Sequence, residues 1–531
     1  MQLYLLVTGP ILVATLGYFL PRRGFRALLL FFQIAQTTLA GYLMVIVRRN
    51  GTILQQVGSW PPAVGIALRA DLLGTTMVFF TTLMYLFLFL YSFRKQYTDN
   101  MFQFLYIVMQ GVTISVFLSQ DIFNLYVLIE VMTIMISVLI MWKRDKQALY
   151  DGTVYLLINL FAMSFFLLGI GLLYRTTGVL SFQALEAYSS GTADPRALIL
   201  PLSFILTAVS LKAALMPLFS WLPHAHGTPS APSIVSAVLS GLLVKVGVYL
   251  YIRLQDIFSA AITFDRFFVV VGAGTALVGI MLALTQRNIK LILAYSTVSQ
   301  IGLIMVGLNS GVAEAYWGSI FHILNHGLFK ALLFLTAGAI AREYGTKDIG
   351  NITGALRRVP IVSIAALLAI LGIIGTPFFN GAISKYLIQS GFSGASEAVI
   401  YLINFGTTLV FVKYAAMFFG DSGAPRKTER DPFVNTVSLV MGVAILGLGI
   451  AARPVIGYLF SVDVDVAGAL YAEKLVAWVL TISIAIPVYS FGVRKAGFLT
   501  TIRQARLSFP DMALLLIVFL AALMAWLTYT V

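Results

Sequence analysis

Long apolar runs, separated by short polar segments, repeat along the whole chain. A helix needs roughly 20 apolar residues to cross the hydrocarbon core of a bilayer. About sixteen runs come close to that length, and the one at 360–391 is too long for a single straight crossing. The others lie at approximately 2–20, 27–47, 71–92, 101–119, 122–141, 153–174, 198–221, 232–252, 267–285, 290–308, 314–340, 397–419, 434–452, 471–491 and 511–530. The pattern predicts an all-α, polytopic membrane protein with about 14–16 transmembrane helices.

The composition favours lipid as the surrounding medium. Hydrophobic residues make up 60% of the chain and charged residues 11%, whereas soluble domains carry about 25% charged residues. The net charge of +14 does not predict nucleic acid as a partner, because no soluble stretch could form a basic groove. The chain has no cysteine, which excludes disulfides, thiolate metal sites and iron–sulfur ligation. The first run, Leu3 to Leu20, has neither a basic segment before it nor a cleavage site after it, and therefore predicts a transmembrane helix rather than a signal peptide.

The basic residues are unevenly distributed over the loops. If residue 1 lies outside, the inner loops hold 21 of the 35 lysines and arginines, and the outer loops hold nine. Cytoplasmic loops of membrane proteins are enriched in lysine and arginine. The distribution therefore predicts that both termini face outward.

Five basic residues remain inside the apolar runs, and all five are lysines: Lys212, Lys245, Lys330, Lys385 and Lys413. A desolvated lysine can lose its proton, whereas arginine effectively cannot. Among the carboxylates, we place only Glu130 in the middle of a run. Ionisable groups at this depth indicate function by default, with a structural ion pair or snorkelling as the alternative. Snorkelling is the main alternative for Lys413, which lies about two turns from the inner end of its run.

Two of the runs contain helix breakers. Pro217 follows Lys212 in LKAALMPLFSWLP, and Pro377 and Gly381 precede Lys385 in GIIGTPFFNGAISKYL. Backbone freed from helical hydrogen bonds is tolerated at membrane depth only where protein or water satisfies it, and paired interruptions indicate transport sites. The two runs are five spans apart, which predicts two five-helix repeats of inverted topology, although single prolines are also common as ordinary kinks. The predicted division is 1–100 and 434–531 for the terminal helices, with the two half-channel units at 101–253 and 265–420.

The four histidines fall into two pairs. His224 and His226 lie in WLPHAHGTPSAP, which predicts an inner loop with solvated side chains or side chains at a channel mouth. His322 and His326 precede Lys330 at four-residue spacing, so the three lie on one helical face. A catalytic zinc site would need a third ligand and a general base, and the sequence around these histidines offers neither. The spacing therefore favours a proton relay, because histidine titrates near neutrality.

Taken together, these motifs resemble those of one family: the antiporter-like subunits of respiratory complex I, the membrane arms of energy-converting hydrogenases and the Mrp-type cation/proton antiporters. The resemblance covers roughly residues 70–420. It rests on DIFNLYVLIEV, LKAALMPLFSWLPHAH, SGLLVKVGVY, RNIKLILAYSTVSQIG, HILNHGLFKALLFL and GTPFFNGAISKYLI. The family core typically has fourteen helices, and the two runs near 471–491 and 511–530 are additional to it. One family branch joins its extra helices by a long lateral helix, but the connection between these two runs is too short for one.

The resemblance implies a proton path. In that path Glu130 and Lys212 form the coupling pair, Lys245 connects it inward, and the remaining carriers are His322, His326, Lys330 and finally Lys385, with Lys413 as a candidate further relay. We expect these side chains to form one polar row, with Glu130 and Lys212 near salt-bridge distance. The family also implies a prokaryotic inner membrane, other membrane subunits as partners, protons as cargo and sodium as an open alternative.

Other interpretations stay open at this point. A stand-alone secondary transporter would need a substrate cavity, and a structural subunit would use its ionisable residues only to join helices. The chain carries no nucleotide loop, flavin fingerprint or metal cluster, so we predict no cofactor and no catalysis by this chain alone. Which of the three kinds of complex would contain the chain does not follow from these motifs.

Overall fold

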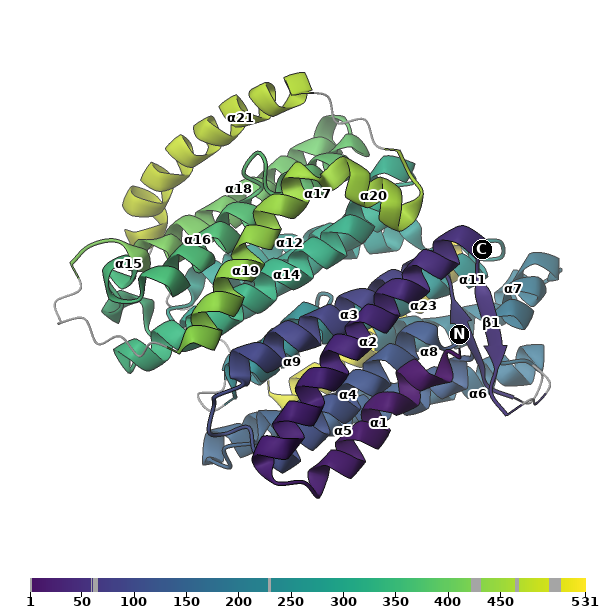
Figure 1. The fold of residues 1–531 in the computed structure, drawn as a ribbon. Coiled ribbons are helices and arrows are strands. Elements are labelled where there is room, and N and C mark those ends of the chain that lie inside the picture. The colour runs from purple at the N-terminus through teal and green to yellow at the C-terminus, as the bar shows by residue number, and fades with distance from the viewer. Residues whose placement is uncertain are drawn as a thin grey trace. The chain divides into compact units, whose positions relative to one another are not determined.

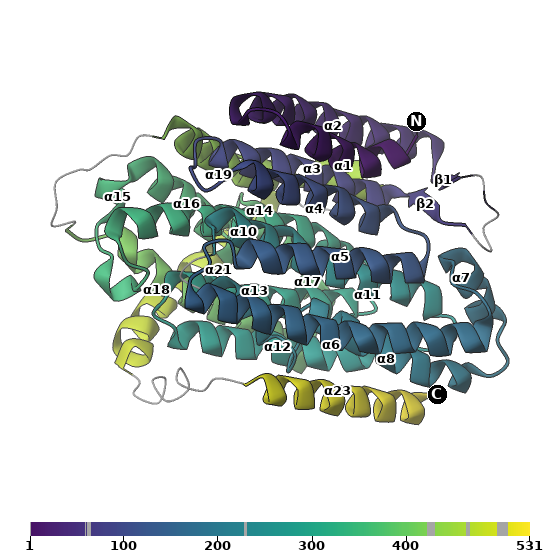
Figure 2. The same cartoon turned by 90° about the horizontal axis from the view of Figure 1, so that it is seen from below.

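The computed structural model describes residues 2–58, 60, 65–227, 231–421, 431–463, 468–495 and 508–531. Nearly all of them are helical (Figure 1, Figure 2). Within these residues, 14 helices are long and apolar enough to cross a membrane. Two shorter apolar helices, α1 (Tyr4–Tyr18) and α16 (Pro360–Ile374), accompany them. The prediction of an all-α polytopic membrane protein is confirmed.

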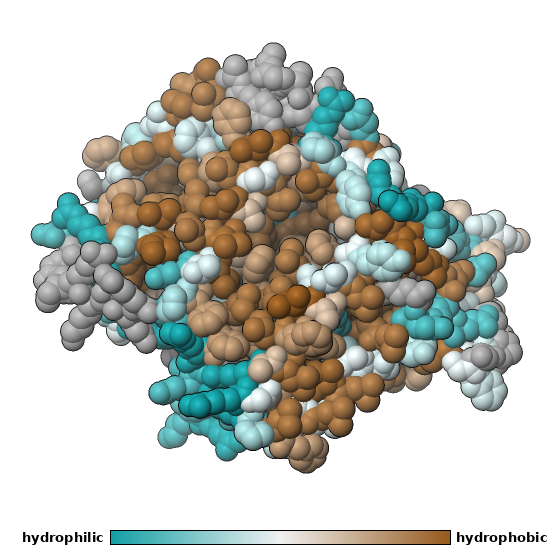
Figure 3. All heavy atoms as spheres, in the orientation of Figure 1, coloured by the Kyte–Doolittle hydropathy of each residue, from teal (hydrophilic) through white to brown (hydrophobic). Residues whose placement is uncertain are grey.

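The surface agrees with this assignment. Figure 3 shows hydrophobic residues over much of one face, with hydrophilic residues gathered in separate groups. Large apolar side chains such as Val270, Ile450 and Phe31 are mostly exposed. Apolar surface of this extent is what a lipid-facing protein presents.

The chain forms two compact units. The first unit contains Met1–Ala213, Leu242–Phe264 and Phe509–Val531. The second unit contains Ala214–Gly241 and Asp265–Ser508. The predicted half-channel boundaries and the inverted repeat remain predictions.

The first unit packs a bundle of long helices. Its helices are α1, α2 (Arg22–Asn50), α3 (Leu72–Ser92), α4 (Asn100–Leu118), α5 (Ile122–Ile140), α6 (Lys146–Thr177), α7 (Phe182–Gly191), α8 (Ile199–Lys212), α11 (Val244–Phe258) and α23 (Phe509–Thr530), with a 3₁₀ turn at Pro195–Leu198. Helix α8 packs along α6 and also contacts α11 and α23. Four of the long helices begin after an aspartate whose carboxylate accepts from a backbone N–H three residues later: Asp71, Asp99, Asp121 and Asp145. These N-caps define helix starts that hydropathy alone locates only roughly.

A short hairpin precedes α3. Strands β1 (Ile53–Gln56) and β2 (Ala67–Ala70) pair antiparallel, with Ile53 opposite Ala70. Hydropathy did not predict this hairpin, because four-residue strands leave no long apolar run. The hairpin brings Arg69 and Asp71 to the start of α3.

The second unit surrounds two deeply buried helices, α13 (Ile289–Leu308) and α14 (Ala313–Tyr344). The other helices of this unit are α9 (Trp221–Gly227), α10 (Ser233–Val238), α12 (Asp265–Thr285), α15 (Ala355–Arg358), α16, α17 (Asn380–Ser390), α18 (Gly394–Ala415), α19 (Pro432–Ile450), α20 (Ala452–Phe460) and α21 (Gly468–Pro487), with short 3₁₀ turns at Ile349–Asn351, Ala416–Phe418 and Val493–Lys495. π-Helical turns lie at Leu239–Leu243 and Val488–Gly492. Helix α14 contacts α10, α13, α16 and α17, which makes it the centre of this unit.

Both runs that contain breakers leave helical geometry at their prolines. Helix α8 ends at Lys212, and α9 begins only at Trp221, so Pro217 lies between them. The long run at 360–391 consists of α16 and α17, with Pro377 in the connection. Each break contains a non-glycine residue in the left-handed region, Ala214 (φ 55°) in one and Phe378 (φ 71°) in the other. Such residues are uncommon and mark places where the surrounding structure dictates the backbone.

Candidate ion-translocation site

Lys212, the last residue of α8, is held by a hydroxyl group. Its side chain is buried, and Nζ donates to Thr133 Oγ1 at 2.6 Å. The Thr133 hydroxyl donates in turn to the Ile129 carbonyl, so its oxygen is available to accept. Thr133 follows Glu130 by one turn of α5. Sequence reasoning missed Thr133, although the i+3 spacing from Glu130 places it beside that carboxylate.

Glu130 is half-buried, and its charge interacts with that of Lys212. The ion pairs within 4.0 Å in the described part of the chain do not include these two residues. The expected direct salt bridge is therefore absent there. Its place at the Lys212 ammonium is taken by the Thr133 hydroxyl, which is compact and lies on the same helix as Glu130.

Lys245 lies on a helix that touches the end of α8. Its side chain is fully buried in α11. A Cβ at Gly247 would lie 2.6 Å from the Lys212 carbonyl carbon and 2.9 Å from Ala213 Cα. Only a glycine permits this approach, so the backbone carrying Lys245 runs directly against the residue at which α8 breaks off.

The predicted relay on α14 is buried throughout. His322, His326 and Lys330 have no exposed surface. The two imidazole rings stack with centroids 6.2 Å apart and planes 16° from parallel. Lys330 donates to the Leu293 carbonyl at 3.0 Å and to the Ser296 hydroxyl, both on α13. The three side chains thus share one face, as their spacing predicted.

His322 joins a polar network that sequence reasoning missed. Its Nδ1 lies 2.8 Å from Ser384 Oγ on α17, and its Nε2 lies 3.1 Å from Gln300 Oε1 on α13. Asn325 and Asn380 exchange a further pair of hydrogen bonds, since Asn325 donates to the Asn380 carbonyl and the Asn380 amide donates to Asn325 Oδ1. The sequence signal that could have revealed this network is the presence of uncharged polar residues inside otherwise apolar helices.

Lys385 follows Ser384 and is buried beside the break between α16 and α17. Its ammonium has no hydrogen-bond partner among the described residues. A Cβ at Gly375, in the break, would lie 3.3 Å from Lys385 Cδ. A buried ammonium without a partner is costly, and such groups are characteristic of functional sites.

The remaining predicted residues differ from the others. His224 and His226 belong to the short helix α9 rather than to a loop, and His226 is fully buried with its ring stacked on Phe334 at 4.4 Å. The prediction of a solvated side chain is wrong for His226, because the aromatic ring of α14 covers it. Lys413 donates to the Leu284 carbonyl at 2.7 Å and to the Gln286 carbonyl, at the end of α12. Its ammonium therefore satisfies helix C-terminal carbonyls, and its part in the relay stays a prediction.

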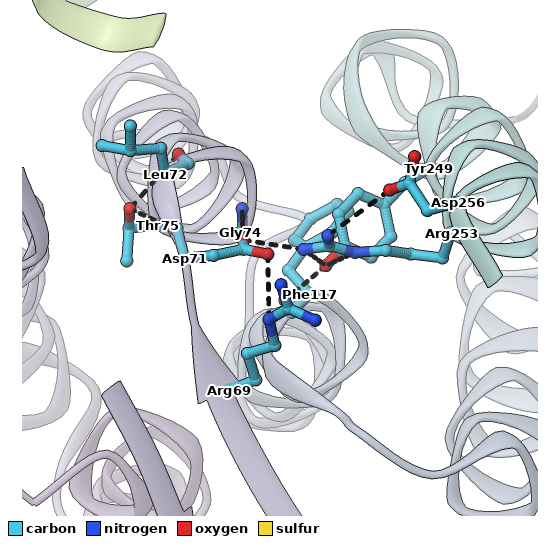
Figure 4. Close-up of polar contacts among 9 residues, drawn as sticks. All are labelled: Arg69, Asp71, Leu72, Gly74, Thr75, Phe117, Tyr249, Arg253 and Asp256. Carbon is cyan, nitrogen blue, oxygen red and sulfur yellow. Dashed lines mark hydrogen bonds and ion pairs between the residues drawn. The ribbon is translucent and has the colours of Figure 1, made fainter. Parts of the chain in front are cut away.

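A buried charge cluster joins α3 to α11 (Figure 4). Arg253 pairs with Asp71 at 2.7 Å, and Arg69 pairs with the other carboxylate oxygen at 3.2 Å. Arg253 also donates to Tyr249 Oη at 2.9 and 2.8 Å. Burial disfavours the Asp71 carboxylate, but attraction to Arg253 and hydrogen bonds from Arg253 and Gly74 outweigh it and hold the pKa of Asp71 below its usual value. Arg253 is one of the nine basic residues that hydropathy places in the outer loops, and its partner Asp71 lies 182 residues earlier, which no local pattern reveals.

The described residues contain no group of three or more His, Cys, Asp or Glu side chains that could hold a metal ion. The arrangement instead offers buried titratable side chains, hydroxyls and amides. Such groups can hold and pass protons.

A family model described as "NADH:quinone oxidoreductase/Mrp antiporter, TM" matches residues 119–411, more than half of the chain. The chain belongs to this family. Within it, a Na(+)/H(+) antiporter subunit of Alkalihalophilus pseudofirmus is 30% identical over 449 residues, which cover 82% of this chain and 90% of that relative. The description of this family names the Mrp antiporters, which are among the proteins that the sequence motifs resemble. The resemblance is therefore confirmed.

Two solved structures share the fold. One is a chain of the membrane-bound sulfane sulfur reductase, an archaeal respiratory membrane complex, with a TM-score of 0.81, 24% identity, and coverage of 90% of this chain and 99% of that chain. The other is a chain of the Mrp complex from Dietzia sp. DQ12-45-1b, with a TM-score of 0.78, 23% identity, and coverage of 94% and 99%. The roles of the individual side chains named above remain predictions.

Proposed function

We propose that this chain carries protons across a cell membrane as one subunit of a multisubunit assembly, and that the assembly is an Mrp-type Na+/H+ antiporter. The observation that carries the proposal is the pair of buried lysines, Lys212 and Lys385, each beside a break in a membrane helix. The relative from Alkalihalophilus pseudofirmus is a Na(+)/H(+) antiporter subunit that matches over 90% of its length. This match favours the Mrp type and supports sodium as the opposing ion.

In the proposed mechanism, Lys212 holds a proton while the Glu130 charge is near and the Thr133 hydroxyl accepts from its ammonium. A movement that separates these groups releases the proton, because a desolvated ammonium without a partner is unfavourable. The proton then passes to Lys245, along His322, His326 and Lys330, and finally to Lys385. The order of these steps is part of the proposal.

The orientation is also part of the proposal. The excess of lysine and arginine in alternate loops supports a topology with both termini on the outer face of a prokaryotic inner membrane. Reporter fusions at Val531 would test it, since an alkaline phosphatase fusion should be active there and a cytoplasmic reporter should not.

The test of function is transport by the complete assembly in vesicles, followed by a pH-sensitive dye. Lys385→Arg should abolish coupled transport, because arginine keeps the positive charge but does not release its proton. Glu130→Gln should also abolish it, since glutamine keeps the shape and removes the charge. Lys143→Arg, at an exposed position, is the matched control and should transport normally. Normal transport by well-folded Lys385→Arg protein would mean that this lysine contributes only electrostatics.

A further inference from the structure

The hydrogen bonds around His322 run in one direction through four helices, from α18 through α13 and α14 to α17. We propose that Gln300 and Thr407 hold neutral His322 with its proton on Nε2, which leaves Nδ1, the nitrogen facing α17, as the atom that accepts the transported proton. This inference rests on the proposed function and assigns Gln300 and Thr407 as positioning residues for the relay.

The direction begins at Thr407 on α18. Its hydroxyl donates to the Ile403 carbonyl at 2.9 Å. A hydroxyl has one hydrogen, so toward any other group its oxygen can only accept. Gln300 Nε2 is the group that donates to it, at 3.1 Å. The amide of Gln300 is thereby oriented with its nitrogen toward Thr407 and its carbonyl oxygen toward His322.

The orientation of Gln300 then determines the tautomer. Gln300 Oε1 carries no hydrogen and lies 3.1 Å from His322 Nε2, so this nitrogen must be the donor. A neutral imidazole has a single N–H. Nδ1 therefore carries the lone pair, and the Ser384 hydroxyl, at 2.8 Å, donates to it.

The opposite arrangement is less favourable. If the Gln300 amide turned over, Thr407 would donate to its oxygen, His322 Nδ1 would donate to Ser384, and Ser384 would donate to a backbone carbonyl. That exchange gives up the 2.9 Å bond from Thr407 to Ile403. The 2.8 Å contact between His322 and Ser384 is kept with its direction reversed, and the bond gained in exchange is the 3.3 Å one from Ser384 to the Asn380 or Gly381 carbonyl. The arrangement with the proton on Nε2 therefore keeps the shorter set of hydrogen bonds.

The same contacts show how a proton would be received. A proton arriving at Nδ1 makes the ring a cation that donates from both nitrogens, to Gln300 and to Ser384. The Ser384 hydroxyl hydrogen then turns to the Asn380 or Gly381 carbonyl, both 3.3 Å away. One proton is gained and one hydroxyl rotates, while no heavy atom has to move. The charge thus arrives on the side of the ring that faces the first turn of α17, the helix of Lys385.

The experiment is ¹⁵N NMR of histidine-labelled protein in the complete assembly, with His322→Gln used to assign the signal. We expect a protonated Nε2 and a bare Nδ1 in the neutral state. Thr407→Val removes the group that orients Gln300 and should produce a mixture of tautomers, whereas Thr407→Ser should keep the wild-type spectrum. Thr408→Val removes the neighbouring buried hydroxyl, which donates to Asn404, and should also leave the spectrum unchanged.

Transport measurements on the same variants separate this inference from the proposed function. Gln300→Glu places a carboxylate at Nε2, stabilises the imidazolium and should slow transport about tenfold or more, because a charged acceptor favours the charged ring. A wild-type signal with the proton on Nδ1 would overturn the inference, even where Lys385→Arg abolishes transport as proposed. If the wild-type signal shows the proton on Nε2 but Gln300→Glu transports normally, the tautomer is upheld. The relay through the His322 ring is then overturned.

Discussion

Gly247→Ala tests the close approach of α11 to the end of α8. The new methyl group would lie 2.6 Å from the Lys212 carbonyl carbon, 2.9 Å from Ala213 Cα and closer still to the Ala213 nitrogen. Non-bonded carbon atoms prefer about 3.5–4.0 Å, so the backbones must separate by roughly 1 Å. All three neighbours are backbone atoms, and no change of rotamer can relieve the contact.

Two effects of opposite sign compete in this variant. Alanine is favoured over glycine in a helix interior by about 0.8–1 kcal/mol. Overpacking of a close contact costs typically about 1–3 kcal/mol. The second effect is larger, and we expect a net loss of roughly 1–2 kcal/mol in the free energy of unfolding.

The loss of transport should exceed the loss of stability. A displacement of this size along the 2.6 Å bond from Lys212 Nζ to Thr133 would take it beyond the usual limit of about 3.2 Å. A misplacement of about 1 Å at a reacting group can lower a rate roughly a hundredfold. We therefore expect a strong loss of proton transport by protein that still folds.

Thermal unfolding of the purified assembly and proton uptake by vesicles are the two measurements. Gly171→Ala is the matched control, because a Cβ at Gly171 in α6 meets no heavy atom within 4 Å. It should be at least as stable as the wild type and transport normally. If Gly247→Ala behaved like Gly171→Ala in both measurements, the close contact of α11 with the end of α8 would be refuted.

Three further predictions concern single groups. Asp71→Asn keeps an oxygen that can accept from Arg253 but removes the carboxylate charge, which leaves the Arg253 charge with only the weaker 3.9 Å pair to Asp256, and should cost up to about 3–5 kcal/mol in chemical unfolding. The pKa of Asp71 in the folded protein lies below its ordinary value. The stability that this carboxylate contributes is therefore complete above about pH 4 and is lost as the pH falls through the folded-state pKa. The unfolding free energy of Asp71→Asn should accordingly depend less on acid pH than that of the wild type. Thr133→Val removes the acceptor of Lys212 and should lower the rate of proton uptake, while Thr133→Ser should restore it; equal rates for both variants would contradict this contact. Lys413→Met should lower the melting temperature through the lost carbonyl contacts and leave the pH profile of transport unchanged, and a displaced profile would place Lys413 in the relay.

Hydropathy predicted the membrane spans because a bilayer imposes the same length on every crossing helix. The breaks at Pro217 and Pro377 could be predicted for a similar reason, since proline acts locally on its own helix. These features depend on residues close together in the chain, and a linear pattern contains them.

The partners of the buried side chains could not be predicted in this way. Thr133, Gln300 and Thr407 are uncharged residues in apolar helices, and only packing shows which of them meet a lysine or a histidine. Arg253 directly follows the apolar run at 232–252, so hydropathy places it in a loop, and its partner Asp71 lies 182 residues earlier. The contacts of Lys413 could not be predicted either, because the carbonyls that accept from it end a helix about 130 residues earlier.

The packing of α23 against α8 and α6 has a consequence for biosynthesis. Helix α8 ends at Lys212, but its neighbour α23 begins only at Phe509 and is therefore synthesised much later. Until α23 has been made, that side of α8 must face lipid or a chaperone, so the first unit cannot complete its assembly before then. Insertion and folding of this unit are therefore separated in time, and a truncated chain that stops before α23 would leave the helix of Lys212 without one of its walls.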